Sequence, residues 1–305
     1  MNGRRIEYPK IGIVIPVFNR LTCTIACLES LKKVKYPNVE IIIIDDGSTD
    51  GTYEVISKAH PYVVLLKGDG NLWWSEATNM GVRRAMVDNC EYVLFLNNDD
   101  EVEDSILYHL ALCAKDNPKS IIGCKVRNYD RPNMLVFAGG DCDWERKGLF
   151  TYGYGEKDEG QHDTRRDIKW IPGAGTFVKV DVFLDIGLID DRAFPHYAAD
   201  IDFTLRAYES GYRIIFEPNA VLYKKMGVNR LSSNRNYSIL QTLIMPLFIR
   251  RSSINLCLQA KFLWRHCPKK YVLKIFILKY YNYYKGIIKM DNILRYLFNE
   301  YRNRM

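Results

Sequence analysis

The feature that most constrains this 305-residue chain is a regular alternation of short apolar runs with segments of helical spacing. Four runs rich in β-branched and aromatic residues occupy 11–18, 39–48, 62–68 and 91–97. Runs of this kind are typical of strands buried on both faces of a parallel sheet. Apolar residues recur at helical spacing in 20–34, 49–60 and 75–89, where Ser75 is placed to cap a helix. The alternation predicts an α/β fold whose mostly parallel central sheet is flanked by helices.

Acidic side chains follow three of these runs at the point where each expected strand ends. They are Asp45 and Asp46 after the second run, Asp69 after the third, and Asp99 and Asp100 after the fourth. In open α/β sheets, ligands bind outside the carboxyl ends of the strands. A solvated turn explains any one of these acids, whereas the three positions together predict one crevice lined by carboxylates.

The second half of the chain is less regular. Glycine, aspartate and tyrosine are frequent in 139–166, which predicts a long loop with short strands that serves as a lid or substrate wall. The segment 168–187 predicts a strand, a glycine-rich turn and another strand. A helix ended by Gly211 is expected in 200–214, and a last strand with a proline break in 213–225.

The formal net charge of +7 combines two regions of opposite sign. Residues 226–305 carry 15 Lys and Arg against two acidic residues, whereas residues 1–225 carry 28 against 34. The C-terminal region mixes these cations with tyrosine and short apolar stretches, which predicts short amphipathic helices. We therefore expect two domains with different partners, 1–225 and 226–305.

Targeting and redox signals favour a cytoplasmic location. The eight cysteines form no Cys-x-x-Cys pair and no metal-ligand spacing with the five histidines, and several lie in apolar runs, as expected in a reducing compartment. The N-terminal apolar stretch is interrupted by Pro9, Lys10 and Pro16, so no signal peptide is expected. No uninterrupted apolar run reaches the roughly 18 to 20 residues of a transmembrane helix.

The polar end of the fourth run has the chemistry of a metal and diphosphate site. Asn97 and Asp99 lie two positions apart on an extended segment, so their side chains point the same way. Mg²⁺ and Mn²⁺ are held by one or two carboxylates while water and phosphate oxygens complete the coordination. Asn97 offers a neutral oxygen, so this pair predicts a weaker site than two aspartates would.

Five ordered motifs together resemble the family 2 glycosyltransferases of the GT-A fold, and most of all the rhamnosyltransferase-like enzymes of bacterial surface polysaccharide assembly. The motifs are IVIPVFNR, IIIIDDGSTDGT, FLNNDDEV, GAGTFV and ADIDFTLRAYESGYRI, within residues 10–225. The resemblance implies a Rossmann-like sheet, a nucleotide diphosphate sugar donor, a divalent Mn or Mg ion, and inversion at the anomeric carbon during transfer to an acceptor hydroxyl.

The resemblance also implies roles for individual residues. Asp99 is the metal ligand, and Asp200 is the catalytic base, with Asp202 as a nearby competitor. The donor side comprises Pro16, Val17, Phe18, Arg20, Asp45 or Asp46, Asn71, Trp74, Asn79, Asn97 and Asn98. The acceptor side comprises Trp73, Gly173, Ala174 and Gly175. Direct displacement needs a base for the acceptor proton and positive charge for the leaving diphosphate, which agrees with these assignments. Asp200 also opens a helix, so a capping role is the alternative.

Three departures from the family pattern affect these assignments. Asn97 stands in place of an acid, Ala199 stands where glutamate commonly precedes the base, and Trp73 with Trp74 replace glycine. The two tryptophans either stack on a sugar ring or belong to the core.

Other polar residues have two interpretations. Glu76 either bonds sugar hydroxyls or lies on the surface. Arg83 and Arg84 either reach phosphate or lie on a solvated helix face, and His196 is either a metal ligand or a packed side chain.

The basic C-terminal region suits an anionic membrane surface, which would place the protein at the inner face of the membrane beside a lipid-linked glycan acceptor. An ordinary helical cap with solvated lysines is the alternative.

Nucleic acid is not expected, since no binding motif is present and residues 1–225 are acidic. A sugar nucleotidyltransferase would need a glycine-rich loop after the first strand, which PVFNRLT lacks. A degenerate transferase that only binds glycan or nucleotide is the non-catalytic alternative.

Overall fold

The computed structural model describes residues 8–226, 243–249 and 252–302, with side chains described as far as residue 287. By its internal contacts the chain divides into two compact units. Unit 1 comprises residues 1–141 and 150–232, and unit 2 comprises 142–149 and 233–305. Part of the apolar segment at 238–251 and the start of the basic region lie outside the described residues.

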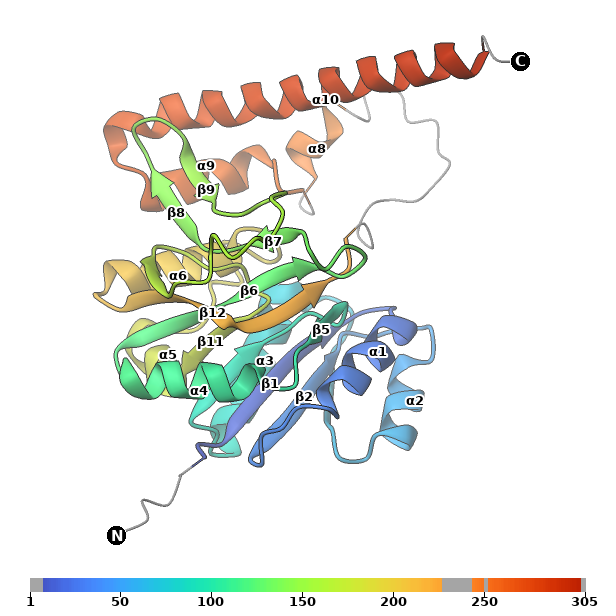
Figure 1. The fold of residues 1–305 in the computed structure, drawn as a ribbon, viewed down its shortest axis with the longest axis vertical. Helices are drawn as coiled ribbons and strands as arrows, with labels where there is room; N and C mark the ends of the chain where they lie inside the picture. The colour runs from blue at the N-terminus through green and yellow to red at the C-terminus, as the bar shows by residue number, and fades with distance from the viewer. Residues whose placement is uncertain (1–7, 227–242, 250–251, 303–305) are drawn as a thin grey trace. The chain divides into compact units, whose positions relative to one another are not determined.

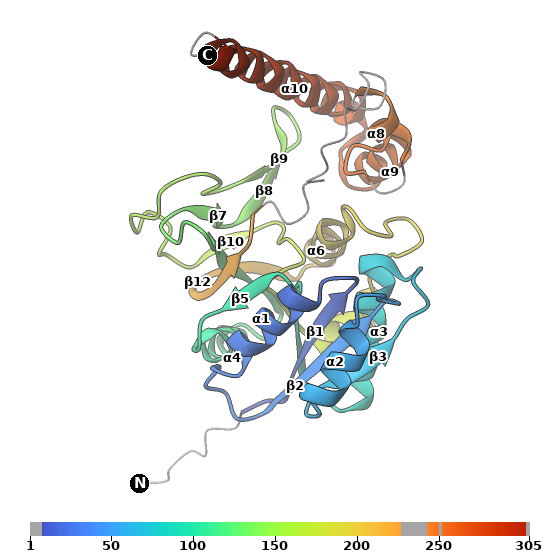
Figure 2. The same cartoon turned by 90° about the vertical axis from the view of Figure 1, so that its right-hand side faces the viewer.

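Unit 1 is built on a mixed β-sheet with helices packed on it (Figures 1 and 2). The strands are β1 (Ile11–Val17), β2 (Val39–Asp45), β3 (Val64–Lys67), β4 (Tyr92–Phe95), β5 (Asp100–Val102), β6 (Ser120–Asn128), β7 (Leu135–Phe137), β10 (Arg166–Ile168), β11 (Thr176–Lys179) and β12 (Arg213–Lys224). The helices are α1 (Leu21–Leu31), α2 (Thr52–Ala59), α3 (Trp73–Val87), α4 (Ile106–Asp116), α5 (Val180–Ile186) and α6 (Ala199–Glu209). The strands β8 (Gly140–Asp143) and β9 (Gly148–Thr151) form a separate two-stranded sheet. Residues 142–149, which include its turn, belong to unit 2.

The main sheet has the strand order β10-β12-β6-β11-β4-β1-β2-β3. The first four strands of the chain pair in parallel, as the alternating pattern predicts. Beyond β4 the sheet is mixed, because β11 runs antiparallel to both β4 and β6. The long strand β12 lies parallel to β6, with a register shift between Glu217 and Val221 at the expected proline break.

In the core of unit 1, helix α3 packs directly on β1 and β2. Val14 and Ile44 are fully buried beneath it. A Cβ atom on Gly81 would come within 2.4 Å of Val14 and 2.7 Å of Ile44, so the helix lies this close only because residue 81 has no side chain. This packing fixes the N-terminal end of α3, which carries Trp73 and Trp74, against the strand ends.

Two elements differ from the sequence-based expectation. Helix α3 begins at Trp73 rather than at Ser75, whose hydroxyl donates to the carbonyl of Phe194 and caps nothing. A carboxylate of Asp46, distant in sequence, accepts the amide of Trp73 and so sets the start of the helix. The segment after β11, expected to continue as strand, is the helix α5.

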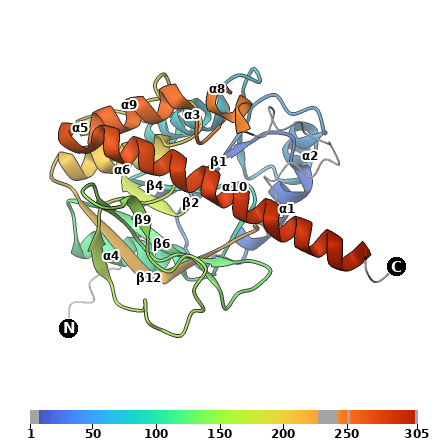
Figure 3. The same ribbon diagram turned by 90° about the horizontal axis from the view of Figure 1, so that it is seen from above.

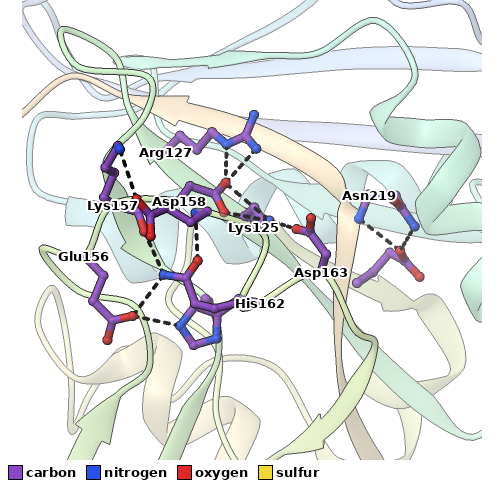
Figure 4. Close-up of polar contacts among 12 residues, drawn as sticks. Lys125, Arg127, Glu156, Lys157, Asp158, His162, Asp163 and Asn219 are labelled. Atoms are coloured by element: carbon purple, nitrogen blue, oxygen red, sulfur yellow. Dashed lines mark hydrogen bonds and ion pairs between the residues drawn. The ribbon is translucent and has the colours of Figure 1, made fainter.

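An ion network holds the segment expected to be a lid onto the sheet (Figure 4). Lys125 on β6 is 1% exposed, and its ammonium lies 3.3 Å from Asp158 and also bonds Asp163. Arg127 donates to the same Asp158 carboxylate at 2.8 Å. Further along the segment, His162 lies 3.0 Å from Glu156. The segment is therefore fixed at its base by buried charge.

Apart from residues 142–149, the described part of unit 2 is helical. Its elements are α8 (Met245–Phe248), α9 (Leu256–His266), a 3₁₀ turn η1 (Lys269–Tyr271) and α10 (Val272–Arg302). Helices α9 and α10 pack together (Figure 3). The 31 residues of α10 exceed the short helices expected. Across the described residues, no helix combines the length and apolarity that crossing a membrane requires.

Candidate active site

The candidate site begins at the loops that leave the parallel strands. Strand β1 lies between β2 and β4 in parallel register, so the ends of all three reach the same edge of the sheet. The loop after β1 is tied to the loop after β2, since the amide of Asn19 donates to the Ser48 hydroxyl at 2.9 Å and its side chain accepts the Thr49 amide at 2.7 Å. Asn19 adopts φ 52°, which an asparagine tolerates better than most residues.

Residues of the expected nucleotide wall lie on the first of these loops. Pro16 and Val17 end β1, and Phe18 is 45% exposed. An exposed aromatic ring beside a rigid strand end is available to stack on a base.

Asp99 is held by Arg20 from across this edge. The Arg20 guanidinium donates to Asp99 Oδ2 at 3.0 Å, and the Asp99 side chain is 5% exposed. The neighbouring Asn98 donates from its buried amide to the Thr24 hydroxyl of α1 at 3.0 Å. The loop after β4 is thus fixed against α1, with Arg20 and Asp99 adjacent.

Trp74 contacts residues predicted for both the donor side and the acceptor side. Its indole N–H donates to Asn97 Oδ1 at 3.1 Å. The same ring lies so close to Gly173 that a Cβ there would come within 2.4 Å of it. Trp74 therefore contacts the polar end of β4 and the glycine-rich turn together, and a larger residue at position 173 would displace its ring.

That turn also holds Asp200. The amide of Gly173 donates to Asp200 Oδ2 at 2.7 Å, and the amide of Ile201 donates to Oδ1 at 2.9 Å. Burial raises the pKa of the Asp200 carboxyl, and these two amides oppose the rise. Such a carboxylate retains basicity for a proton-transfer role. The turn itself needs glycine at Gly175, where φ is 82° and a Cβ would meet Leu222 at 2.6 Å.

The competing acid, Asp202, has a different environment. It is fully buried and accepts from Arg206 Nε at 3.0 Å, while Arg206 also donates to the carbonyls of Ile186 and Leu188. Asp202 thus holds α6 to the preceding loop. Of the two carboxylates, Asp200 is the one at the glycine-rich turn.

Asp100 and Lys224 form a pair that sequence reasoning did not single out. They are opposite each other in the antiparallel register of β5 and β12. Asp100 is fully buried; one oxygen accepts the Asn97 amide at 2.9 Å, and the other has no hydrogen-bond partner among the described residues. Burial raises the pKa of Asp100 to about 6, and the charge of Lys224 opposes the rise. The same lysine also lowers the pKa of Asp200. The only sequence signal was a cation at the end of the last strand.

Asp45 and Asp46, at the end of β2, accept hydrogen bonds from backbone amides of the neighbouring loops. Asp45 is buried and accepts the Ser48 amide at 2.9 Å. Asp46 accepts three amides of the following loop, from Gly70, Leu72 and Trp73, at 2.9, 3.2 and 3.0 Å. Their roles toward base or ribose stay predictions, and the arrangement shows that both shape the loops of the donor side.

Asp69 and Asn71 lie on the loop that precedes α3. Asp69 is exposed, and its carboxylate accepts the amide of the equally exposed Asn71 at 2.8 Å. The one acid on the loop after β3 thus serves a local turn, while the buried carboxylates follow β2 and β4.

Several other candidates have structural partners. Both ends of the Asn79 amide bond the backbone of Ile189, at 2.9 and 3.1 Å. Glu76 pairs with Arg83 on the α3 surface, and the Trp73 ring lies edge-on to His196 at 6.2 Å. Asn79 therefore anchors a loop, and its donor-binding role stays a prediction. Ala174, between the two glycines of the turn, is 5% exposed.

The donor set at Asp99 fits a divalent cation that the substrate completes. Among the described residues, no three His, Cys, Asp or Glu side chains are grouped as a self-contained metal site. Asp99 supplies one carboxylate, partly engaged by Arg20. The expected extended segment is a turn, in which the Asp100 amide donates to the Asn97 carbonyl at 3.2 Å, so the spacing of Asn97 and Asp99 does not align their side chains. The Asn97 side-chain oxygen accepts from Trp74. Mg²⁺ and Mn²⁺ accept this ligand count when phosphate and water supply the remaining oxygens.

Solved structures similar to this chain identify the class of fold. The structure of GalNAc-T7 with UDP, GalNAc and Mn²⁺ aligns with a TM-score of 0.58 at 16% identity, over 73% of this chain and 45% of that chain. TarS 1–349 of S. aureus in complex with UDP aligns with a TM-score of 0.53 at 17% identity, over 84% and 71%. The mixed sheet with helices on its faces is the GT-A glycosyltransferase fold, as the motifs predict.

The family described as Glycosyl transferase family 2 matches residues 12–168, more than half of the sequence, and the chain belongs to this family. Glycosyltransferase GlyG of Streptococcus pneumoniae serotype 4 is 28% identical over 39% of this chain and 40% of its own length. The probable glycosyltransferase YdaM of Bacillus subtilis is 24% identical over 72% of this chain and 51% of its own length. The chain thus spans about half or less of these curated relatives.

Proposed function

We propose that this protein is an inverting glycosyltransferase that moves a sugar from a nucleotide diphosphate sugar to a hydroxyl of a glycan or lipid-linked glycan during assembly of a bacterial surface polysaccharide. The observation that supports this most is the placement of Asp200. Its carboxylate bonds the Gly173 amide at 2.7 Å, Trp74 packs against that glycine, and Trp74 bonds Asn97 at 3.1 Å. Direct contacts therefore link the proposed base Asp200, the glycine-rich turn proposed for the acceptor side, and the polar end of β4.

In the proposed reaction, Asp200 accepts the proton of the acceptor hydroxyl as its oxygen attacks the anomeric carbon. A new carbon–oxygen bond forms on one face while the bond to the diphosphate breaks on the other, and the bonding electrons leave with the diphosphate. A positioned base of this kind contributes on the order of 10²–10⁴-fold. The raised pKa of Asp200 brings its basicity closer to the operating pH.

Protein cations on the donor side would meet the charge of the leaving diphosphate. Arg20 lies beside Asp99, and Lys224 lies opposite Asp100 in the sheet. Both are positioned to stabilise negative charge that grows as the bond breaks. When a divalent cation is bound, Asp99 with Asn97 nearby would hold it, and it would supply further charge neutralisation to the diphosphate.

The motif resemblance makes deoxythymidine diphosphate-rhamnose the first donor to test. Uridine diphosphate sugars come second, supported by the UDP bound in the two similar structures. A peripheral position at the inner face of the membrane would bring the site to lipid-linked acceptors.

A degenerate, non-catalytic binding protein is the second candidate. It is favoured by the ion pair that encloses Asp99 and by Asn97 and Ala199, two departures from the family pattern. Such a protein would bind a nucleotide diphosphate and hydrolyse or transfer nothing.

Thermal unfolding with a panel of nucleotide diphosphates and their sugars, with and without Mn²⁺, tests the proposal. A ligand at 100 times its Kd adds about 2.7 kcal/mol to the stability, enough to raise Tm by roughly 5 °C. We expect one nucleotide to do this in a Mn²⁺-dependent manner, and Asp99→Ala to abolish the Mn²⁺ dependence. Turnover of that nucleotide sugar separates the enzyme from the degenerate protein, and absence of any shift on folded protein would count against both.

A further inference from the structure

Helix α10 carries an exposed apolar stripe. Leu273, Ile277 and Tyr281 are 71, 59 and 59% exposed. They recur every four residues, and since successive helical residues are about 100° apart, they lie on one face. Large apolar side chains aligned in this way on a helix are normally covered by something.

Contacts of other side chains fix the orientation of α10 within unit 2. Ile275 is 4% exposed, the Tyr280 hydroxyl donates to the Ile254 carbonyl at 2.9 Å, and that of Tyr284 donates to the Leu243 carbonyl at 3.0 Å. These bonds hold one side of α10 against the rest of the unit. Tyr280 and Tyr284, seven residues after Leu273 and Ile277, lie beside the stripe, whose own side chains stay exposed.

Exposed lysines lie along one edge of the stripe, beside Tyr281. Residues 252–287 contain seven Lys and Arg and no Asp or Glu. Lys274 and Lys285 are exposed and lie eleven residues, about three turns, apart, on the same side as Tyr281. Lys279 belongs to the packed face, donates to Gln259 at 2.6 Å, and has a pKa lowered to about 8 by burial.

The helix before α10 adds an aromatic side chain of the same character. Trp264 on α9 is 65% exposed, and the ammonium of Lys269 lies 4.0 Å from its ring centre. Tryptophan and lysine together are typical of the boundary between lipid headgroups and acyl chains.

We propose that the α10 stripe of Leu273, Ile277 and Tyr281, with its flanking lysines, is a docking face for an anionic lipid surface. An apolar stripe with exposed lysines along one edge, in a segment without acidic residues, suits a helix that lies in the membrane interface, with its apolar side chains among the acyl chains and its lysines at the phosphates. None of the described helices is suited to span a bilayer, which agrees with surface binding. A protein partner would need acidic side chains along the full length of the helix.

Flotation of the full chain with vesicles tests this proposal. We expect binding to phosphatidylcholine vesicles with about one-third phosphatidylglycerol, little binding to pure phosphatidylcholine, and weakening as salt is raised. The double variant Leu273→Glu and Ile277→Glu should bind at least roughly 100-fold more weakly. Lys274→Glu with Lys285→Glu should lose about tenfold or more.

Leu184→Glu provides the matched control, because Leu184 is 75% exposed in unit 1. It should float like the unmodified chain, and every variant should keep the same circular dichroism melt. Nucleotide-induced thermal shifts should be unchanged in all of them, so this test is independent of the proposed activity.

Three results would overturn the proposal. One is no binding of the folded chain to anionic vesicles, and another is equal binding by the stripe variant. The third is a dimer in light scattering that the stripe variant converts to a monomer, because the occupant of the face would then be a second copy of the chain.

Discussion

At the scale of single residues, the site separates its carboxylates by environment. Asp99 has an arginine at 3.0 Å and Asp202 has one at 3.0 Å, whereas Asp200 accepts the backbone amides of Gly173 and Ile201 and has a raised pKa. Carboxylates paired with cations favour the charged form, whereas burial favours the protonated form. These differences support the proposed proton-accepting role of Asp200 and the proposed role of Asp99 beside the diphosphate.

Asp200→Asn should lower turnover by on the order of 10²–10⁴-fold with little change in nucleotide affinity. A base acts only when deprotonated, so a raised pKa moves the acidic limb of the rate profile to higher pH than an ordinary aspartate would give. We expect kcat/KM to fall as the pH drops through that pKa, and the residual activity of the variant to lack this limb. Measuring both profiles checks the assignment, and Asp202→Asn, which breaks the pair with Arg206, should lose stability instead.

Lys224→Met tests the cation that sequence reasoning missed. The charge of Lys224 lowers the pKa of both Asp100 and Asp200, so its removal should raise them further and shift the acidic limb of the rate profile upward. Loss of one charge beside a diphosphate should reduce turnover by about tenfold.

The neighbouring Lys225 offers the control. It pairs with Glu101 at 2.7 Å on the other side of the strand, and Lys225→Met should change the rate less than about threefold. Equal effects of the two substitutions, or an unmoved pH profile in Lys224→Met, would assign Lys224 a purely structural role.

At the scale of elements, the strands and helices with local signals were predictable. The β-branched runs gave β1, β2 and β4, and the periodic leucines gave α1. The local sequence pattern does not predict where an element begins when contacts with residues distant in sequence determine that position. The start of α3 depends on the Asp46 carboxylate, which accepts the Trp73 amide from a separate strand end, and no local signal at Ser75 reveals this.

The same reason explains the other differences. Val180–Ile186 has the apolar content of a strand, but it is a helix that packs on α6 and β11. No element was assigned to 103–138, where α4 and β6 lie. For the candidate site, the family resemblance indicated Asp99 and Asp200. The contact of Trp74 with Asn97 depends on tertiary packing, and the pairing of Asp100 with Lys224 depends on strand register, neither of which is visible in a single sequence.

The segment 152–165 is held to β6 by the bonds of Asp158 with Lys125 and Arg127, and its stability should depend on them. Lys125→Met should destabilise the fold by roughly 2–4 kcal/mol, because Asp158, 5% exposed, loses one of its two cations. Proteolysis within 152–165 should accelerate. The exposed Lys157, which pairs with Glu159, provides the control, and Lys157→Met should be neutral within about 0.5 kcal/mol.

Acid should weaken the same anchor. Burial raises the pKa of Asp158, but the bonds from Arg127 and the charge of Lys125 more than offset this, so the net pKa is lowered. A carboxyl with a lowered folded-state pKa contributes stability that is complete above its unfolded pKa, about 4, and is lost as the pH falls below it. A denaturant titration at pH 7 and pH 3.5 should show the Lys125→Met penalty shrink, and a pH-independent penalty would attribute it to packing alone.

At the scale of the whole molecule, chemistry and charge are divided between the two units. Every candidate for donor, metal, acceptor or base, from Pro16 to Asp200, belongs to unit 1. The net charge of residues 226–305 is +13, whereas that of residues 1–225 is −6. An acidic unit that handles an anionic donor needs its own cations at the site, which is where Arg20 and Lys224 lie, while the basic region is free to meet an anionic surface.

Removal of residues 233–305 should therefore separate the two properties. The shortened chain should keep its nucleotide-induced thermal shift and its turnover with a water-soluble acceptor, because the candidate residues and the sheet that positions them remain. It should lose vesicle binding and, with it, the advantage on an acceptor presented in anionic vesicles, where a docked enzyme meets substrate at a raised local concentration. Parallel assays with soluble and vesicle-borne acceptor measure the ratio. A shortened chain that folds but binds no nucleotide would mean that unit 2 supplies part of the donor site, and an unchanged ratio would mean that docking does not govern access to the acceptor.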